Sequence, residues 1–175
     1  MNDAEFPRPL RAETIGDDPR QIEIEATQSE RAALAARFEL IALDRVSASF
    51  TIRRDGQGIV ANGRVRATLT QACSVTGDAL PAAIDEAVAL RFVPQGDDSQ
   101  EEVELGDGDL DVIPYVGSDI DLGETAAETI LLAIDPFPRG PRAAALLAEA
   151  GVVSEDDARP LGAFAGLKDK LAGRS

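Results

Sequence analysis

The sequence has no histidine, no tryptophan and a single cysteine among its 175 residues. Without histidine the chain can form neither a Ser-His-Asp nor a Cys-His arrangement, and it has no histidine general base. One cysteine cannot close an internal disulfide, and too few soft ligands remain for a structural zinc site within one chain. The commonest hydrolase chemistries are therefore excluded, and we expect no metal and no cofactor.

Basic residues are missing from a long internal stretch. Residues 95–138 contain 13 Asp and Glu but no Lys or Arg, whereas residues 1–94 carry 11 of the 17 basic residues. The net charge is −15, and nucleic acid repels such a chain unless its positive groups gather on one surface. The placement of the basic residues therefore decides whether nucleic-acid binding is physically reasonable.

Long apolar runs are also missing. No window approaches the roughly 18 apolar residues that a membrane span needs, and the charged N-terminus lacks the apolar core of a signal peptide. The length favours one domain with tails, since typical domains have about 100–150 residues. With 44% hydrophobic and only 4% aromatic residues, we expect an aliphatic core. The lack of long apolar runs predicts a soluble, cytoplasmic protein with no membrane partner.

Apolar and polar residues alternate in three successive runs, at residues 46–52, 59–69 and 84–92. A period of two is typical of half-buried strands, and short turns join the runs, among them the glycine-containing residues 54–58. Three such strands predict an antiparallel β-meander or a partly closed barrel.

Helical signals lie on both sides of these runs. A short strand is predicted at residues 21–26 and a helix at 30–38, capped by Thr27 or Ser29. A second helix begins near Asp121 and ends before Pro136, because proline cannot continue it. Two more helices are predicted at residues 141–150 and 161–171. Helices and strands without a repeated β-α-β order predict an α+β fold.

The expected organisation has three parts. They are a flexible N-terminal arm at residues 1–20, an α+β domain at residues 21–138 with an acidic loop at 95–111, and a helical C-terminal extension at residues 139–175.

The alternation also predicts where five arginines lie. Position along a strand fixes the face that a side chain occupies. If the apolar faces are buried, one surface carries the candidate RNA-binding residues Arg45, Arg53, Arg64, Arg66 and Arg91. A second interpretation stays open, because arginines often cover the exposed side of a sheet and pair with acidic residues. The acidic residues close in sequence are Asp44, Asp55, Asp85 and Glu86.

The acidic loop supplies a second candidate site. Its candidate partner-binding residues are Asp97, Asp98, Glu101, Glu102 and Glu104. These carboxylates would either contact a basic partner such as a ribosomal protein or shield the arginine face until RNA displaces them. Both interpretations stay open.

The turn after the second run contains Cys73, Thr76 and Gly77. Gly77 suits the turn, and free cysteine is usually buried, so a packing or turn role is favoured over catalysis. The neighbours of Cys73 are uncharged, and little is expected to stabilise a thiolate there.

Three stretches resemble the bacterial YceD family, also called large ribosomal RNA subunit accumulation protein. The stretches are VRATLTQACSVT at residues 65–76, DLGETAAETILLAIDPFP at 121–138 and RPLGAFAGLK at 159–168. The resemblance implies a role in the accumulation or processing of large-subunit (23S) ribosomal RNA, without known catalysis. Many members have a second cysteine where this chain has Thr76, and the threonine resembles alphaproteobacterial forms. The metal or redox role that a cysteine pair would suggest at the turn therefore does not carry over to this chain.

The leading hypothesis is a non-enzymatic ribosome-assembly factor that binds precursor ribosomal RNA, or the assembling particle, through its arginine face. The alternative is an adaptor whose acidic loop contacts a basic ribosomal protein. A third class, an enzyme that uses carboxylates and a metal ion, is the least favoured by the residues.

Overall fold

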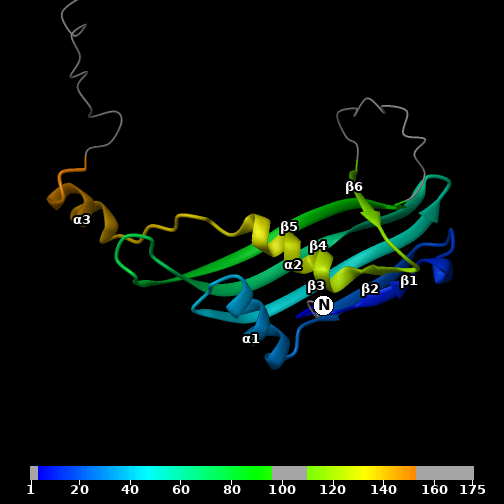
Figure 1. The fold of residues 1–175 in the computed structure, drawn as a ribbon, viewed down its shortest axis with the longest axis horizontal. Helices are drawn as coiled ribbons and strands as arrows, with labels where there is room; N and C mark the ends of the chain where they lie inside the picture. The colour runs from blue at the N-terminus through cyan, green and yellow to red at the C-terminus, as the bar shows by residue number, and fades with distance from the viewer. Residues whose placement is uncertain (1–3, 96–109, 153–175) are drawn as a thin grey trace, which may run out of the picture.

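The computed structural model describes residues 4–95 and 110–152 (Figure 1). The strands are β1 (Pro9–Arg11), β2 (Arg20–Glu25), β3 (Ala42–Asp55), β4 (Gly58–Ala72), β5 (Ala79–Pro94), β6 (Asp111–Tyr115) and β7 (Asp119–Asp121). The helices are α1 (Gln28–Arg37), α2 (Leu122–Ala133) and α3 (Ala143–Glu149), with a short 3-10 helix η1 (Ala12–Thr14). The predicted helix at residues 161–171 lies outside the described residues.

The larger sheet has the strand order β2-β3-β4-β5-β6. β3, β4 and β5 are antiparallel, as the alternation predicts, and β2 also pairs antiparallel with β3, whereas β6 runs parallel to β5. Pro114 lies within β6, where a missing backbone N–H is tolerated because the strand is at the edge. The sheet is open, so the α+β class and the meander are confirmed and the partly closed barrel does not form.

Helix α2 lies across one face of the sheet (Figure 1). The Asp121 carboxylate caps it by accepting hydrogen bonds from the backbone N–H groups of Gly123 at 2.9 Å and Glu124 at 3.1 Å. These amides have no partner within the helix, so the cap stabilises its first turn. The helix ends at Ala133, ahead of Pro136, as predicted.

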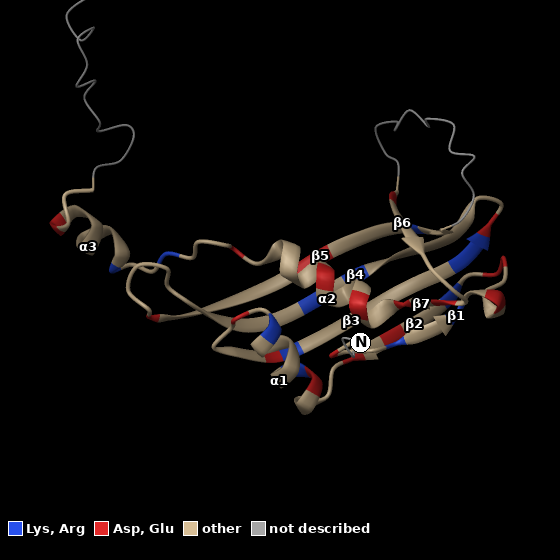
Figure 2. Cartoon of the chain, viewed as in Figure 1, with Lys and Arg blue, Asp and Glu red and all other residues tan. Residues whose placement is uncertain are grey.

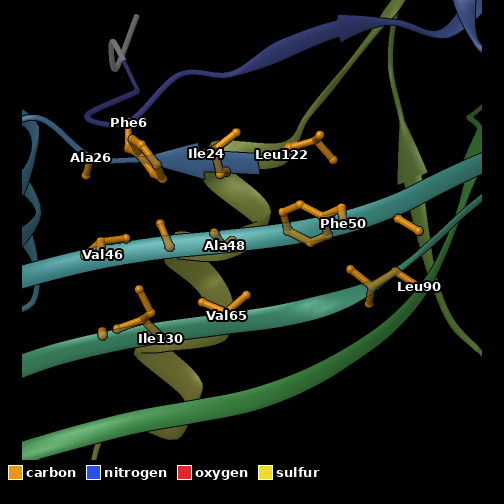
Figure 3. Close-up of a cluster of buried hydrophobic side chains, with 14 of the residues drawn as sticks. Phe6, Ile24, Ala26, Val46, Ala48, Phe50, Val65, Leu90, Leu122 and Ile130 are labelled. Atoms are coloured by element: carbon orange, nitrogen blue, oxygen red, sulfur yellow. The ribbon is translucent and has the colours of Figure 1, made fainter. Parts of the chain in front are cut away.

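The core lies between α2 and the sheet (Figure 3). Alternate residues of β3, namely Val46, Ala48 and Phe50, turn toward the helix and are buried. From α2 the side chain of Ile130 meets this layer and is fully buried. The core is mainly aliphatic, as the sparse aromatic content predicts.

The N-terminal segment differs from the flexible arm expected over residues 1–20. Phe6 is fully buried in the core, and β1 pairs antiparallel with β7, which lies more than a hundred residues later in the chain. The prolines in this segment suggested mobility, but they only fix φ and remove a donor. Local pattern could not reveal a strand whose partner is so distant in sequence.

Arg8 joins the N-terminal segment to both helices. Its backbone N–H donates to the Asp121 carboxylate at 2.9 Å, and its guanidinium donates to both carboxylate oxygens of Glu30, at 2.7 and 3.0 Å. Glu30 also accepts from the backbone N–H of Thr27, which completes a capping box at the start of α1. One arginine therefore connects the N-terminal segment with the starts of α1 and α2.

Gly123 tests the close packing of this segment on α2. A Cβ at this position would lie 1.7 Å from the carbonyl oxygen of Phe6, so Gly123→Ala must displace backbone. We expect the free energy of unfolding to fall by about 1–3 kcal/mol, the usual cost of overpacking. Urea denaturation of the full chain measures it.

Gly56→Ala is the matched control, because a Cβ there meets nothing within 4 Å. Its free energy of unfolding should change by no more than about 0.5 kcal/mol. Equal shifts in the two variants would show that the N-terminal segment does not pack on α2 as described.

The Arg8–Glu30 pair predicts a pH dependence of stability. Hydrogen bonds from Arg8 are the main cause that lowers the pKa of Glu30 from 4.5 to about 2. Because the pKa of Glu30 is lower in the folded state, the ionised Glu30 contributes fully to the free energy of unfolding above about pH 4.5. This contribution is lost as the pH falls toward 2. Glu30→Gln should therefore cost about 1–2 kcal/mol at neutral pH and almost nothing near pH 2. Urea midpoints at both pH values measure this, and parallel curves for the two proteins would contradict it.

Candidate nucleic-acid interface

The face of the sheet opposite α2, which we call the outer face, is not covered by any helix in residues 4–95 and 110–152 (Figure 1). Antiparallel register places residues that lie directly opposite each other on the same face. All five arginines predicted to share a face do so. They are Arg45 and Arg53 on β3, Arg64 and Arg66 on β4, and Arg91 on β5.

Figure 2 shows basic positions along the sheet strands and acidic positions on α2. In the register, Arg66 lies between Ser47 of β3 and Asp85 of β5, and Arg64 lies beside Ser49. Arg53 and Arg91 lie on either side of Val60 in β4. Val60 is four residues from Arg64 on the same strand, a separation of about 13 Å at the usual rise per residue. The arginines therefore form a stripe across three strands.

Most of these arginines are paired with carboxylates. Arg64 and Arg66 both contact Asp85, at 2.7 and 3.4 Å. Arg91 contacts Asp55 at 2.6 Å, and Arg45 lies 3.8 Å from Glu25. Within the described residues Arg53 makes no ion pair. The five side chains therefore share a face, as predicted, and carboxylates pair with four of them.

The acidic partners lie only in part where the sequence suggested. Asp55 and Asp85 are on the outer face, whereas Glu86 lies opposite Val65 and faces the helix side. Asp44 makes no ion pair within the described part of the chain.

Glu23 and Glu25 border the outer face along β2, opposite Ser49 and Ser47. These two glutamates were not among the predicted site residues, although their alternation with two isoleucines in the predicted strand indicates this position. Together with Asp55 and Asp85 they set four carboxylates against five arginines, so the face as a whole is nearly neutral.

The central ion pairs are exposed to solvent. The side chains of Arg64 and Asp85 are 44% and 54% exposed, and that of Arg66 is 58% exposed. Hydrogen bonding from Arg64, and then from Arg66, lowers the pKa of Asp85, which therefore stays ionised at neutral pH. Exposed pairs of this kind contribute little to the stability of a fold, because solvent and salt screen them. A phosphate could therefore replace Asp85 at little cost, and each guanidinium keeps further donors for it.

The turn that contains Cys73, Thr76 and Gly77 joins β4 to β5. Gly77 has a φ of 72°, and its N–H donates to the carbonyl of Cys73 at 2.9 Å. The Thr76 hydroxyl accepts from the backbone N–H of Asp78 at 3.2 Å. The residue types at this motif therefore account for the turn geometry itself.

Cys73 also holds a distant segment. Its buried Sγ accepts a hydrogen bond from the N–H of Gly140 at 3.3 Å, and Arg142 pairs with Asp78 of the same turn. The Gly140 N–H is the main cause that lowers the pKa of Cys73, to about 7, with help from Thr76 and Val75. The expectation that little stabilises a thiolate was therefore wrong, because the donor lies 67 residues away in the sequence. These contacts nonetheless agree with a packing role.

The acidic candidates Asp97, Asp98, Glu101, Glu102 and Glu104 lie outside the described residues. None of the helices in the described part of the chain combines the length and the apolar character that crossing a membrane would need.

The model of a protein family described as Large ribosomal RNA subunit accumulation protein YceD matches residues 61–169. The chain belongs to the YceD family. The match confirms the resemblance seen in the sequence, and the family's name links it to the accumulation of large-subunit ribosomal RNA. It includes Arg64, Arg66, Arg91 and the Cys73 turn, whereas Arg45 and Arg53 precede it. No curated protein and no solved structure matches the chain.

Proposed function

We propose that this YceD protein is a non-enzymatic, cytoplasmic ribosome-assembly factor that binds precursor large-subunit (23S) ribosomal RNA, or the assembling particle, through the outer face of its sheet. The observation that carries the proposal is the shared face of Arg45, Arg53, Arg64, Arg66 and Arg91. The family's link to large-subunit RNA supports the same role.

Residues around the arginine stripe suit contact with a phosphate backbone. Ser47 and Ser49 lie beside Arg66 and Arg64, and their hydroxyls add donors for phosphate oxygens. On the other side of Arg64 lies Ala87, whose small side chain leaves room for a strand of nucleic acid. Such contacts position the RNA without reading its sequence, so sequence preference would come from the rest of the particle.

The net charge of the chain supplies most of the selectivity in this proposal, because −15 repels isolated nucleic acid. Asp85 adds a small contribution, since its carboxylate lies beside Arg64 and Arg66, where a phosphate would bind, but is displaced at little cost. A particle that offers several phosphates in the right arrangement makes enough contacts to overcome both.

The double variant Arg64→Glu and Arg66→Glu tests the face. We expect weaker co-sedimentation with large-subunit precursor particles and a salt dependence of RNA binding that is shallower by roughly one unit per lost phosphate contact. Sucrose gradients and filter binding at several salt concentrations measure both. Arg20→Glu with Arg139→Glu is the control, because it makes the same change in total charge away from the face. Equal behaviour of the two double variants would reject the face.

Asp85→Asn tests whether RNA must displace Asp85 from Arg64 and Arg66, because it removes the carboxylate rather than the arginines. The substitution releases two guanidiniums at once, so we expect RNA to bind about two- to fivefold more tightly, in line with the small energies of exposed ion pairs. The gain should be largest at low salt and absent in the Arg64→Glu and Arg66→Glu background. Unchanged or weaker binding by Asp85→Asn would contradict the proposal.

The second candidate is a protein-binding adaptor whose acidic loop, including Asp97 and Glu104, contacts a basic ribosomal protein. The near-neutral outer face and the net charge of −15 favour it. Crosslinking in cells discriminates the two, because an RNA-binding factor recovers precursor RNA directly whereas an adaptor recovers only protein.

A further inference from the structure

Most of strand β5 has an open edge among the described residues. β4 pairs with one side of β5 from Ala79 to Phe92, but β6 pairs with the other side only at Leu90–Pro94. Among the described residues no strand pairs with the other side of β5 from Ala79 to Ala89. Pro81 lacks a backbone N–H, so Ala82–Ala89 is the part that can accept a full new strand. Alternate residues direct N–H and C=O to the open side, about four of them here.

The two sides of the sheet differ in how well their edge strands are protected from pairing with another chain. The opposite edge is β2, which is only six residues long and alternates glutamates with isoleucines, a common way to discourage pairing. On β5 the charge of Asp85 is engaged by arginines on the outer face. The β5 edge is therefore the longer and less protected of the two.

A groove runs beside this edge, between β5, β6 and α2. Its apolar lining includes Val88, Leu90 and Leu132, and the Leu132 side chain at the end of α2 is 87% exposed. A side chain so apolar and so exposed buries nothing in the described fold. It is placed to cover an apolar residue of a strand added at the edge.

The groove is also uniformly negative. Glu86, Asp111 and Glu128 line it, and none of its described lining residues is Lys or Arg. The last turn of α2 has no basic residue either, so the partial negative charge of its C-terminus adds to the same field. A ligand with positive charge is therefore favoured.

We propose that the open edge of β5 and this groove bind an extended, basic peptide segment of a partner protein by strand addition. Its main chain hydrogen-bonds to Ala82–Ala89, as in other cases of β-augmentation. Its side chains alternate between the two faces of the sheet. Those on the helix side meet Glu86, Glu128 and Leu132, so basic and apolar residues are selected there.

A second copy of the chain fits the edge poorly. Two β5 edges paired about a two-fold axis would bring Glu86 and Glu128 of both copies into one groove, between molecules that each carry a net charge of −15. The charge of the groove therefore selects a basic partner over self-association.

The experiment uses the full chain and a fluorescently labelled eight-residue peptide of alternating Lys and Val. Anisotropy should report saturable binding that weakens with salt, whereas a peptide with Glu in place of Lys should not bind. N-methylation of alternate amides should abolish binding, because it removes the main-chain donors that strand addition requires. Hydrogen exchange should show that amides of Ala82–Ala89 gain protection when the Lys-Val peptide is added.

Glu86→Lys combined with Glu128→Lys should raise the dissociation constant of the Lys-Val peptide at least tenfold. Glu23→Lys with Glu25→Lys changes the charge equally at the β2 edge and should leave its binding unchanged. The Arg64→Glu and Arg66→Glu variant should bind the peptide at least as tightly as the parent, so this proposal and the RNA proposal can fail separately. Equal effects of the two Glu→Lys pairs, or binding that protects no amide of Ala82–Ala89, would overturn the proposal. A dimer in sedimentation equilibrium that the peptide cannot dissociate would do the same.

Discussion

The pleated register of β3, β4 and β5 is the constraint on which the rest of the molecule depends. Each residue along these strands is either under α2 or on the outer face, because side chains alternate with a period of two. A slip of one residue in β4 would exchange Val65 with Arg66 and bury a guanidinium in an aliphatic core. Burial of the apolar side chains in the core therefore also fixes the positions of the arginines on the opposite face.

The helix side of the sheet is closed by contacts between segments distant in the sequence. Phe6 fills the core, Gly123 lets the N-terminal backbone approach α2, and Arg8 ties this segment to Asp121 and Glu30. One face of the sheet is therefore buried in the core, where it contributes to the stability of the fold. The outer face and most of the β5 edge are thereby left uncovered within the described residues.

Charge is balanced locally rather than across the whole chain. Salt screens exposed charges beyond about 10 Å, so the net charge of −15 does not by itself set the field at each surface. Carboxylates pair with four of the five arginines on the outer face, and Glu86 and Glu128 line the groove on the helix side. The outer face is thus nearly neutral, whereas the groove is negative.

The sequence by itself determined the four antiparallel strands β2 to β5, the main helices, the shared face of the five arginines and the family, because period-two alternation, helix caps and proline stops are local signals. Only the tertiary structure decided the pairing of β1 with β7, the parallel placement of β6, the pairing of Asp85 with two arginines and the Gly140 N–H that stabilises the Cys73 thiolate. Each of these joins residues that are far apart along the chain or depends on side-chain geometry within the assembled sheet. No local pattern encodes such contacts, because chain closure and packing of the whole core select them.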